Sequence, residues 1–204
     1  MSKIAKKNKG LILVLSGPSG SGKTTLLREL LKRRILGKKI SRSISLTTRS
    51  KRTGERNGRD YFFVTEDEFK ERLKKKKILE WTRYLGYYYA TPRDFIEKQL
   101  KSGKYVGLCL DFKGALKLKR FYPENTMTIF VMPPSLETLQ HRIQKRCSKT
   151  RIEEVKKRLF LAKRELLLAD KYDYCIINND LEQAVNTLKD IVIGEILSNV
   201  REAK

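Results

Sequence analysis

The feature that most constrains the fold is an apolar run that leads directly into a glycine-rich loop and then an amphipathic helix. The run Leu11 to Ser16 (LILVLS) is typical of a parallel strand buried on both faces. The loop from Gly17 to Thr24 (GPSGSGKT) matches the pattern G-x-x-x-x-G-K-[ST]. After it, leucines recur at positions 26, 27, 30 and 31, on one face of a helix. This order of strand, loop and helix predicts a phosphate-binding loop.

The loop has the chemistry that a nucleotide phosphate needs. Glycines let the backbone bend so that successive N–H groups point at phosphate oxygens, and the start of the helix adds a positive partial charge. In this pattern Lys23 pairs with the β and γ phosphates, and the Thr24 hydroxyl is a ligand of Mg²⁺. An ordinary glycine-rich turn between a strand and a helix requires neither residue. The nucleotide-binding candidates are Gly17, Ser19, Gly20, Ser21, Gly22, Lys23, Thr24 and Thr25.

The rest of the chain alternates between apolar runs and amphipathic stretches. Further buried strands are expected at Val106 to Leu110, Thr128 to Met132 and Tyr174 to Ile177. Helices are expected after a capping box of Thr65 and Glu68, after an N-cap at Thr91 with Pro92, from Pro133 to Arg146, from Glu153 to Ala169, and after Asp180. This alternation indicates an α/β fold with a parallel sheet. The segment Ser41 to Ala90 interrupts it and is expected to be an inserted subdomain.

Composition limits the classes of protein to consider. A chain of 204 residues with 40% hydrophobic residues has the length and apolar content of about one folded domain. Its 46 basic and 23 acidic residues give a net charge of +23, which indicates anionic partners. No apolar run is long enough to cross a bilayer, and the basic start lacks the apolar core of a signal peptide. We therefore expect a soluble, cytoplasmic protein with no membrane partner. Cys109, Cys147 and Cys175 lack zinc-binding spacing and are expected to be reduced thiols.

A second anion site is predicted within the interrupting segment. Arg49, Arg52 and Tyr61 lie within thirteen residues of one another. They can hold one phosphate together, because a guanidinium group binds two phosphate oxygens at once and a phenol adds one donor. A second phosphate site beside the first suits a nucleoside monophosphate.

At these residues the sequence resembles the guanylate kinase family. The resemblance is carried by GPSGSGKTTL, by SLTTRSKRTGERNGRDYFF from Ser45, by LEW at Leu79 to Trp81, by YYYAT and by LCLDFKG, and it extends from about Leu11 to Asp180. It implies the three-layer fold of P-loop NTPases, with a central parallel sheet, an inserted mixed GMP-binding subdomain and a helical lid. It divides the chain into a core at residues 1–40 and 92–204, which includes a lid at about 140–160, and a GMP-binding subdomain at residues 41–91.

The resemblance also implies a role for each matching residue. The GMP phosphate would be held by Arg49, Arg52, Tyr61 and Tyr89. The guanine would be surrounded by Ser45, Glu80 and Asp111, with Thr91 as a further substrate contact. ATP would be contacted by Asn178 and by the lid arginines Arg142, Arg146 and Arg158. The catalytic residues would be Lys23, Arg49, Arg146 and Arg158, because phosphoryl transfer depends on positioning and electrostatic stabilisation.

The chemistry of guanine supports the role implied for Glu80. The Watson–Crick edge of guanine offers N1–H and N2–H₂ as donors, and one ionised carboxylate accepts both. Adenine lacks this pair of donors and would leave the carboxylate desolvated and unpaired.

Three residues depart from the family's pattern. Cys109 stands where an Asp or Glu is common, Ala90 where a glycine is usual, and Lys113 where a glutamine is frequent. A carboxylate at the first position would orient Mg²⁺ or its waters, and a neutral thiol is a poor substitute. Either the metal is then held by Thr24, phosphates and water, with help from Asp111, or turnover is weakened.

The leading hypothesis is an enzyme that transfers the γ-phosphoryl group of MgATP to GMP, and also to dGMP, with ATP and Mg²⁺ as cofactors. The alternative is a catalytically weak guanylate-kinase-like module for protein interactions, which Cys109 alone favours. A different monophosphate kinase with the same core is a closer rival. The lysines are spread along the chain, which argues against a specific nucleic-acid partner. A monomer or a homodimer is expected.

Overall fold

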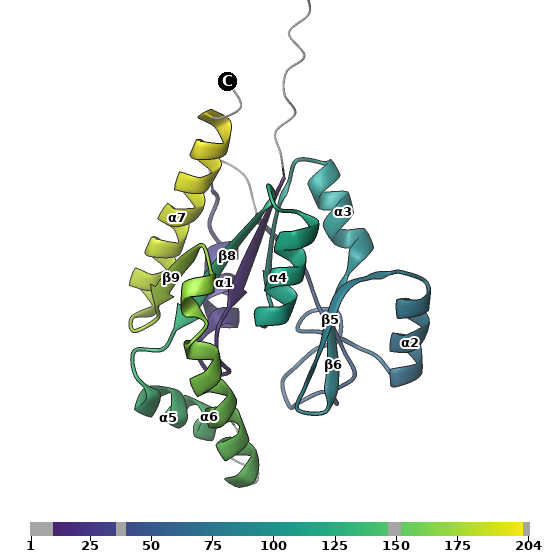
Figure 1. Cartoon of the computed structure of the whole chain (residues 1–204), viewed down its shortest axis with the longest axis vertical. Helices are drawn as coiled ribbons and strands as arrows, with labels where there is room; N and C mark the ends of the chain where they lie inside the picture. The colour runs from purple at the N-terminus through teal and green to yellow at the C-terminus, as the bar shows by residue number, and fades with distance from the viewer. Residues whose placement is uncertain (1–9, 36–39, 147–151, 202–204) are drawn as a thin grey trace, which may run out of the picture.

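A five-stranded parallel sheet forms the centre of the molecule (Figure 1). The computed structural model describes residues 10–35, 40–146 and 152–201. The strands lie in the order β2-β7-β1-β8-β9, and each pair of neighbours is parallel. Their bounds are β1 Leu11–Ser16, β2 Ile40–Arg42, β7 Tyr105–Cys109, β8 Thr126–Met132 and β9 Tyr174–Ile177. Because β1 is the middle strand, the loop that follows it leaves the sheet at its centre.

Helices cover both faces of this sheet, because alternate residues of β1 point to opposite faces. Leu13 and Leu15 belong to a core cluster with apolar residues of α1 (Lys23–Leu31) and α7 (Leu181–Arg201). Ile12 and Val14 belong to a second cluster with residues of α3 (Arg93–Lys101) and α4 (Phe112–Phe121). The three-layer α/β architecture expected from the sequence is confirmed.

A smaller mixed sheet lies beside the central one. Its order is β4-β3-β6-β5, in which β3 and β4 are parallel and the other pairs antiparallel. The bounds are β3 Leu46–Thr47, β4 Phe62–Phe63, β5 Ile78–Tyr84 and β6 Tyr87–Pro92. Helix α2 (Glu66–Lys74) packs Phe69 into the core of this sheet and begins with the predicted capping box of Thr65 and Glu68. A hairpin joins β5 and β6 through Leu85 and Gly86, which both have positive φ.

Two further helices, α5 (Leu136–Arg146) and α6 (Ile152–Leu166), pack against each other through Leu139, Ile143 and Ala162. In Figure 1 they lie at the opposite end of the molecule from the C-terminus. The β5–β6 hairpin also lies toward that end of the view. The helix pair and the smaller sheet thus project from the same end of the central sheet.

Most of the predicted elements are confirmed within one or two residues, and the differences have local causes. The N-cap of α3 is Pro92, so the prediction of Thr91 as the cap is wrong. Thr91 pairs with Glu80 in the β5–β6 ladder instead. The helix expected to reach Ala169 ends at Leu166, and a 3₁₀ turn follows it. The short strands β2 and β3 are not predicted, because two or three residues carry no periodicity.

The described part of the chain contains no helix that is long and apolar enough to cross a membrane. Cys109 and Cys175 are free thiols, as expected. Cys147 lies outside the described residues.

Gly107→Ala tests how closely α1 packs on the sheet. A Cβ on Gly107 of β7 would lie 2.6 Å from Cδ1 of Leu27 and 3.4 Å from Cγ2 of Ile40. Since all three residues are buried, the added methyl group forces close-packed groups apart. We expect the free energy of unfolding, measured by urea denaturation, to fall by about 1–3 kcal/mol. The matched control is Gly194→Ala in α7, where a Cβ meets open space. Equal stability of the two variants would contradict the prediction.

Candidate functional site

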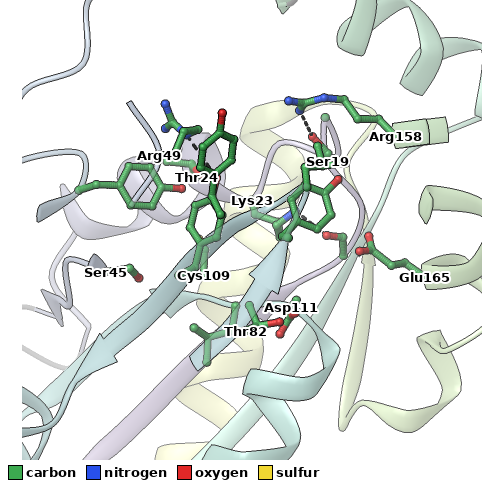
Figure 2. Close-up of a pocket in the computed structure, with 18 of the residues that line it drawn as sticks. Ser19, Lys23, Thr24, Ser45, Arg49, Thr82, Cys109, Asp111, Arg158 and Glu165 are labelled. Atoms are coloured by element: carbon green, nitrogen blue, oxygen red, sulfur yellow. Dashed lines mark hydrogen bonds between the residues drawn. The ribbon is translucent and has the colours of Figure 1, made fainter. Parts of the chain in front are cut away.

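One large pocket opens beside the loop that follows β1. It has a volume of about 1680 Å³. Lys23, Cys109 and Asp111 line it near the carboxyl ends of β1 and β7, the usual place for a ligand site in an open parallel sheet. Figure 2 shows Lys23 near the centre of the view, with Arg49 to one side and Arg158 to the other.

The pocket brings together most of the residues selected from the sequence. It is lined by Gly17, Ser19, Gly20, Gly22, Lys23, Thr24, Thr25, Ser45, Arg49, Arg52, Tyr61, Glu80, Tyr89, Asp111, Arg142, Arg158 and Asn178. Ser21 and Thr91 do not line it and are fully buried. Arg146 belongs to α5, but its side chain lies outside the described residues. Segments that are distant in the sequence therefore meet at one site.

The loop between β1 and α1 owes its shape to three glycines. Gly17, Gly20 and Gly22 have φ values of 129°, 90° and 95°, a region that residues with a Cβ rarely adopt. A Cβ on Gly17 would lie 2.5 Å from the carbonyl oxygen of Val131. The ammonium group of Lys23 folds over the loop and donates to two of its carbonyl oxygens, at 2.5 and 2.8 Å. The loop thus holds a positive charge close to its own backbone.

Asn178 fixes this loop from the end of β9. Its side-chain amide donates to the Ser21 carbonyl oxygen at 2.8 Å, and its backbone N–H donates to the Met132 carbonyl oxygen at 2.8 Å. A Cβ on Gly22 would lie 2.2 Å from the Asn178 amide nitrogen, so only glycine fits there. The Arg142 guanidinium donates to the Asn178 carbonyl oxygen at 3.4 Å. The side chain that the resemblance assigns to ATP is thus engaged in holding the loop.

Across the pocket, Arg49 is held by a carboxylate. Its guanidinium donates to both oxygens of Glu55, at 2.9 and 3.0 Å, and to the Tyr89 hydroxyl at 3.2 Å. It also lies 5.4 Å from the ring centroid of Tyr61 and 5.7 Å from that of Phe63. Burial is the largest single effect on Glu55 and opposes its ionisation, but the hydrogen bonds from Arg49 and from the Arg52 backbone, together with the charges of both arginines, lower the pKa of this carboxyl group. Arg49 is therefore a fixed cation.

Glu80 is a carboxylate that is only 3% exposed and still lines the pocket. The pairing of β5 with β6 shifts register between Ile78 and Glu80, the kind of irregularity that redirects side chains beside functional sites. The Thr91 hydroxyl donates to Glu80 Oε1 at 2.5 Å. Burial raises the pKa of Glu80 to about 7; the Thr91 hydrogen bond lowers it and the Asp111 charge raises it further. Thr91 thus orients the carboxylate from behind the pocket.

Arg158 connects α6 to the phosphate-binding loop. It is buried and donates to the Ser19 hydroxyl at 3.2 Å, the contact drawn in Figure 2. It also donates to Glu154, one turn earlier in α6, at 2.5 and 3.0 Å. The α5–α6 pair therefore places a paired cation directly on the loop.

Comparisons with known proteins agree with this geometry. A sequence model of the guanylate kinase family matches residues 9–195. A curated guanylate kinase of Wolbachia pipientis wMel is 43% identical over 196 residues, which cover 96% of this chain and 96% of that protein. The chain belongs to the guanylate kinase family.

Two other guanylate kinases show how far the likeness extends. A curated one of Bacillus subtilis (strain 168) is 43% identical over 197 residues, which cover 97% of this chain and 95% of that protein. The crystal structure of guanylate kinase from Anaplasma phagocytophilum has a TM-score of 0.77 and 34% identity, and it covers 93% of this chain and 87% of that one. The likeness in sequence and in fold therefore spans nearly the whole chain.

Several carboxylates at the site of this guanylate kinase family member are missed by the sequence analysis, among them Glu154, Glu165 and Glu55. Glu165 lines the pocket from α6, seven residues after Arg158 and thus on the same face of the helix. Burial raises its pKa to about 7; the Lys23 charge lowers it and the Asp111 charge raises it. Glu55, which holds Arg49, lies inside the motif that carries the family resemblance. In the sequence, the spacing of seven residues between Arg158 and Glu165, which places both on one face of a helix, is the signal that could have identified Glu165.

Cys109 gives the pocket a neutral group where the family commonly has a carboxylate. It ends β7 and lines the pocket near Thr24. Burial raises the pKa of its thiol, although the Lys23 and Arg42 charges lower it. No group of three or more His, Cys, Asp or Glu side chains in the described ranges could hold a metal ion. Cys109 therefore offers a metal ion no hard oxygen ligand at this position.

Asn178→Ala removes the amide that fixes the phosphate-binding loop. The buried Ser21 carbonyl oxygen then loses its partner, which costs about 1–3 kcal/mol and favours local opening. Hydrogen exchange at residues 20–24, followed by mass spectrometry, is expected to accelerate by about 5- to 150-fold, the factor that this energy represents. The matched control is Asn179→Ala at the exposed neighbouring position. Unchanged exchange in Asn178→Ala would show that the amide does not hold the loop.

Proposed function

We propose that this member of the guanylate kinase family transfers the γ-phosphoryl group of ATP to the α-phosphate of GMP, or of dGMP, and releases ADP with GDP or dGDP. One observation carries the proposal: the glycine loop with Lys23 and the carboxylate of Glu80 open onto the same pocket. The loop suits a nucleoside triphosphate, and the carboxylate suits a guanine edge. The relatives named as guanylate kinases support the same activity.

In the proposed acceptor site, ionised Glu80 accepts hydrogen bonds from N1–H and N2–H₂ of guanine. The Thr91 hydroxyl holds one carboxylate oxygen, so the carboxylate is oriented before guanine arrives. Ser45 and Asp111 line the pocket and complete the proposed base site. A base without two adjacent donors leaves a desolvated carboxylate with the Thr91 hydroxyl but without the donors it needs from the base, which costs about 1–3 kcal/mol. The site therefore favours guanine over adenine by the charge of Glu80.

The acceptor phosphate is proposed to bind Arg49, Arg52, Tyr61 and Tyr89, which all line the pocket. Glu55 occupies donors of Arg49 and fixes the plane of its guanidinium group. The Tyr89 hydroxyl accepts from the same group, which orients the phenol as well. Less side-chain freedom is then lost when a phosphate binds, and this favours affinity.

The donor site is proposed to combine the loop from Gly17 to Thr25 with charges from Lys23, Arg142, Arg146 and Arg158. In the transfer step, an oxygen of the GMP phosphate forms a bond to the γ-phosphorus. The bond from that phosphorus to the β–γ bridging oxygen breaks, and its electron pair leaves with ADP. Lys23, Arg49 and two of the arginines of the α5–α6 pair, Arg146 and Arg158, stabilise the negative charge on the transferred group. No covalent intermediate with the protein is needed.

The residues at the loop fit a magnesium ion that is held mainly by the ATP phosphates. Thr24 is exposed to the pocket at the start of α1, and its hydroxyl is the kind of hard oxygen ligand that Mg²⁺ prefers. The protonated thiol of Cys109 is a poor ligand for this ion. Bound Mg²⁺ supplies charge neutralisation between phosphate oxygens.

The alternative of a catalytically weak interaction module is not favoured. Lys23 and Thr24 both line the pocket, and the curated relatives that match nearly the whole chain are named as kinases. Cys109 alone favours this alternative, and it removes no positive charge from the pocket.

A panel of acceptors tests the proposed activity. With MgATP, we expect a diphosphate product from GMP and dGMP, and none from AMP or UMP, in a steady-state assay. Lys23→Ala is expected to lower kcat by about 10²- to 10³-fold, because the charge facing the transferred group is lost. The matched control is Lys32→Ala, whose exposed ammonium pairs with Glu29. Turnover of AMP in preference to GMP would contradict the proposed acceptor.

Glu80 is expected to make GMP binding dependent on pH. Its carboxyl group has a pKa of about 7 in the free protein and must be ionised to accept from guanine. Below that pH the ionised fraction falls about tenfold per unit, so the Kd for GMP rises by the same factor. Calorimetric titration between about pH 5.5 and 8 measures this change.

Glu80→Gln is the control for this titration. It is expected to weaken GMP binding by about 10- to 100-fold, since the amide offers a donor where guanine has donors. Its remaining pH dependence reports the groups other than Glu80, which include Glu165 in the same pocket and the GMP phosphate, which titrates at about pH 6. Parallel pH profiles for the wild type and Glu80→Gln would show that Glu80 is not the titrating group.

A further inference from the structure

The first turn of α4 lies directly against the carboxylate of Glu80. Gly114 is the third residue of α4 and is buried. A Cβ built on it would lie 2.8 Å from Glu80 Oε2 and 3.2 Å from Glu80 Cδ. The first distance is shorter than a methyl group allows, and the second is a tight contact that the carboxyl group would have to relieve by a small shift. The carboxylate therefore occupies the space that any other residue at position 114 would fill.

The backbone does not explain why this residue is a glycine. Gly114 is not among the glycines with positive φ, so an L-residue can adopt its conformation. Glycine is a poorer helix former than alanine, by up to about 1 kcal/mol at interior positions, and nothing in the backbone of this first turn favours it. Helix stability alone therefore does not account for glycine at position 114. The nearest atoms to the missing Cβ belong to Glu80 and Asp111, so a tertiary contact accounts for it.

Gly114 also belongs to the contacts that fix its surroundings. Its N–H donates to Asp111 Oδ1 at 2.8 Å, which makes Asp111 the N-cap of α4. On the other side of the carboxylate, the Thr91 hydroxyl holds Oε1. Glu80 is thus held between a hydroxyl group of β6 and the bare Cα of a capped helix, and neither side can move away freely.

We propose that Gly114 is a specificity-determining residue that positions the carboxylate of Glu80 for the Watson–Crick edge of the acceptor base. This proposal rests on the proposed function. It adds to the acceptor site a residue that acts on the base through Glu80 and does not contact the substrate itself. When a Cβ is added, the carboxylate yields first, because it is the end of a flexible side chain and the helix is rigid. The displaced oxygens then no longer match the two donors of guanine.

Gly114→Ala tests this role. We expect the KM for GMP to rise by about 10- to 100-fold, the effect of a misplacement of about 1 Å. The KM for ATP and the melting temperature are expected to stay close to those of the wild type. Gly194→Ala is the matched control, since it adds the same methyl group to a helix where nothing lies within 4 Å.

A double-mutant cycle separates positioning from a general disturbance of α4. Glu80→Asp shortens the acid by one methylene, so its oxygens no longer reach the added Cβ. In that background, Gly114→Ala is expected to weaken GMP binding less than it does in the wild type. Equal effects in the two backgrounds would overturn the proposal.

Discrimination between GMP and IMP gives a measurement that is independent of how much of the variant is folded. IMP lacks the N2 amino group, so it offers the carboxylate one donor where GMP offers two. We expect the ratio of kcat/KM for GMP over IMP to fall in Gly114→Ala. An unchanged ratio would overturn the role of Gly114, whereas a wild type that forms no GDP would overturn the proposed function itself.

Discussion

The site depends on the close fit of a glycine loop against two neighbouring strands. Gly17 packs on the backbone of Val131 in β8, and Gly22 packs on the side chain of Asn178 at the end of β9. These contacts leave no space for side chains, and they place the start of α1 at the carboxyl end of β1. The positive end of the helix, the loop amides and Lys23 then face the same pocket. The central sheet thus fixes the position of the anion site.

Two of the arginines around this anion site are buried and already paired with carboxylates. Arg49 pairs with Glu55 and Arg158 pairs with Glu154, and both arginines are under a tenth exposed. A buried cation without a partner would be costly, and mutual repulsion among these charges would add to that cost. The carboxylates remove both problems and fix the guanidinium planes. Each of these two guanidinium groups would therefore meet a phosphate, in the proposed function, in an orientation set in advance.

The sequence predicts the parts of this structure that depend on short-range patterns. The strand Leu11–Ser16, the loop after it and the capping box at Thr65 are all local, and the structure confirms them. The family resemblance adds a set of residues that line one pocket although they lie far apart in the chain. Neither the pattern nor the resemblance shows that Thr91 lies behind Glu80.

The remaining features arise from tertiary contacts. Asn178 holds the loop only because β9 ends beside it, and Gly114 is needed only because β5 brings Glu80 against α4. A register shift of one residue in β5 is enough to redirect Glu80, and no propensity encodes it. Glu165 reaches the pocket because α6 crosses it, although its spacing from Arg158 is visible in the sequence.

Two carboxyl groups of the pocket, Glu80 and Glu165, both have a pKa of about 7, raised by burial. The proposed ligands would act on them in opposite directions. If GMP binds as proposed, the donors of guanine favour the ionised form of Glu80 and lower its pKa. The Lys23 charge lowers the pKa of Glu165 in the free protein. A triphosphate paired with Lys23 would weaken this effect and favour the neutral form of Glu165, which repels phosphates less. The same burial would thus suit one carboxyl group to accept hydrogen bonds and the other to stay neutral beside anions.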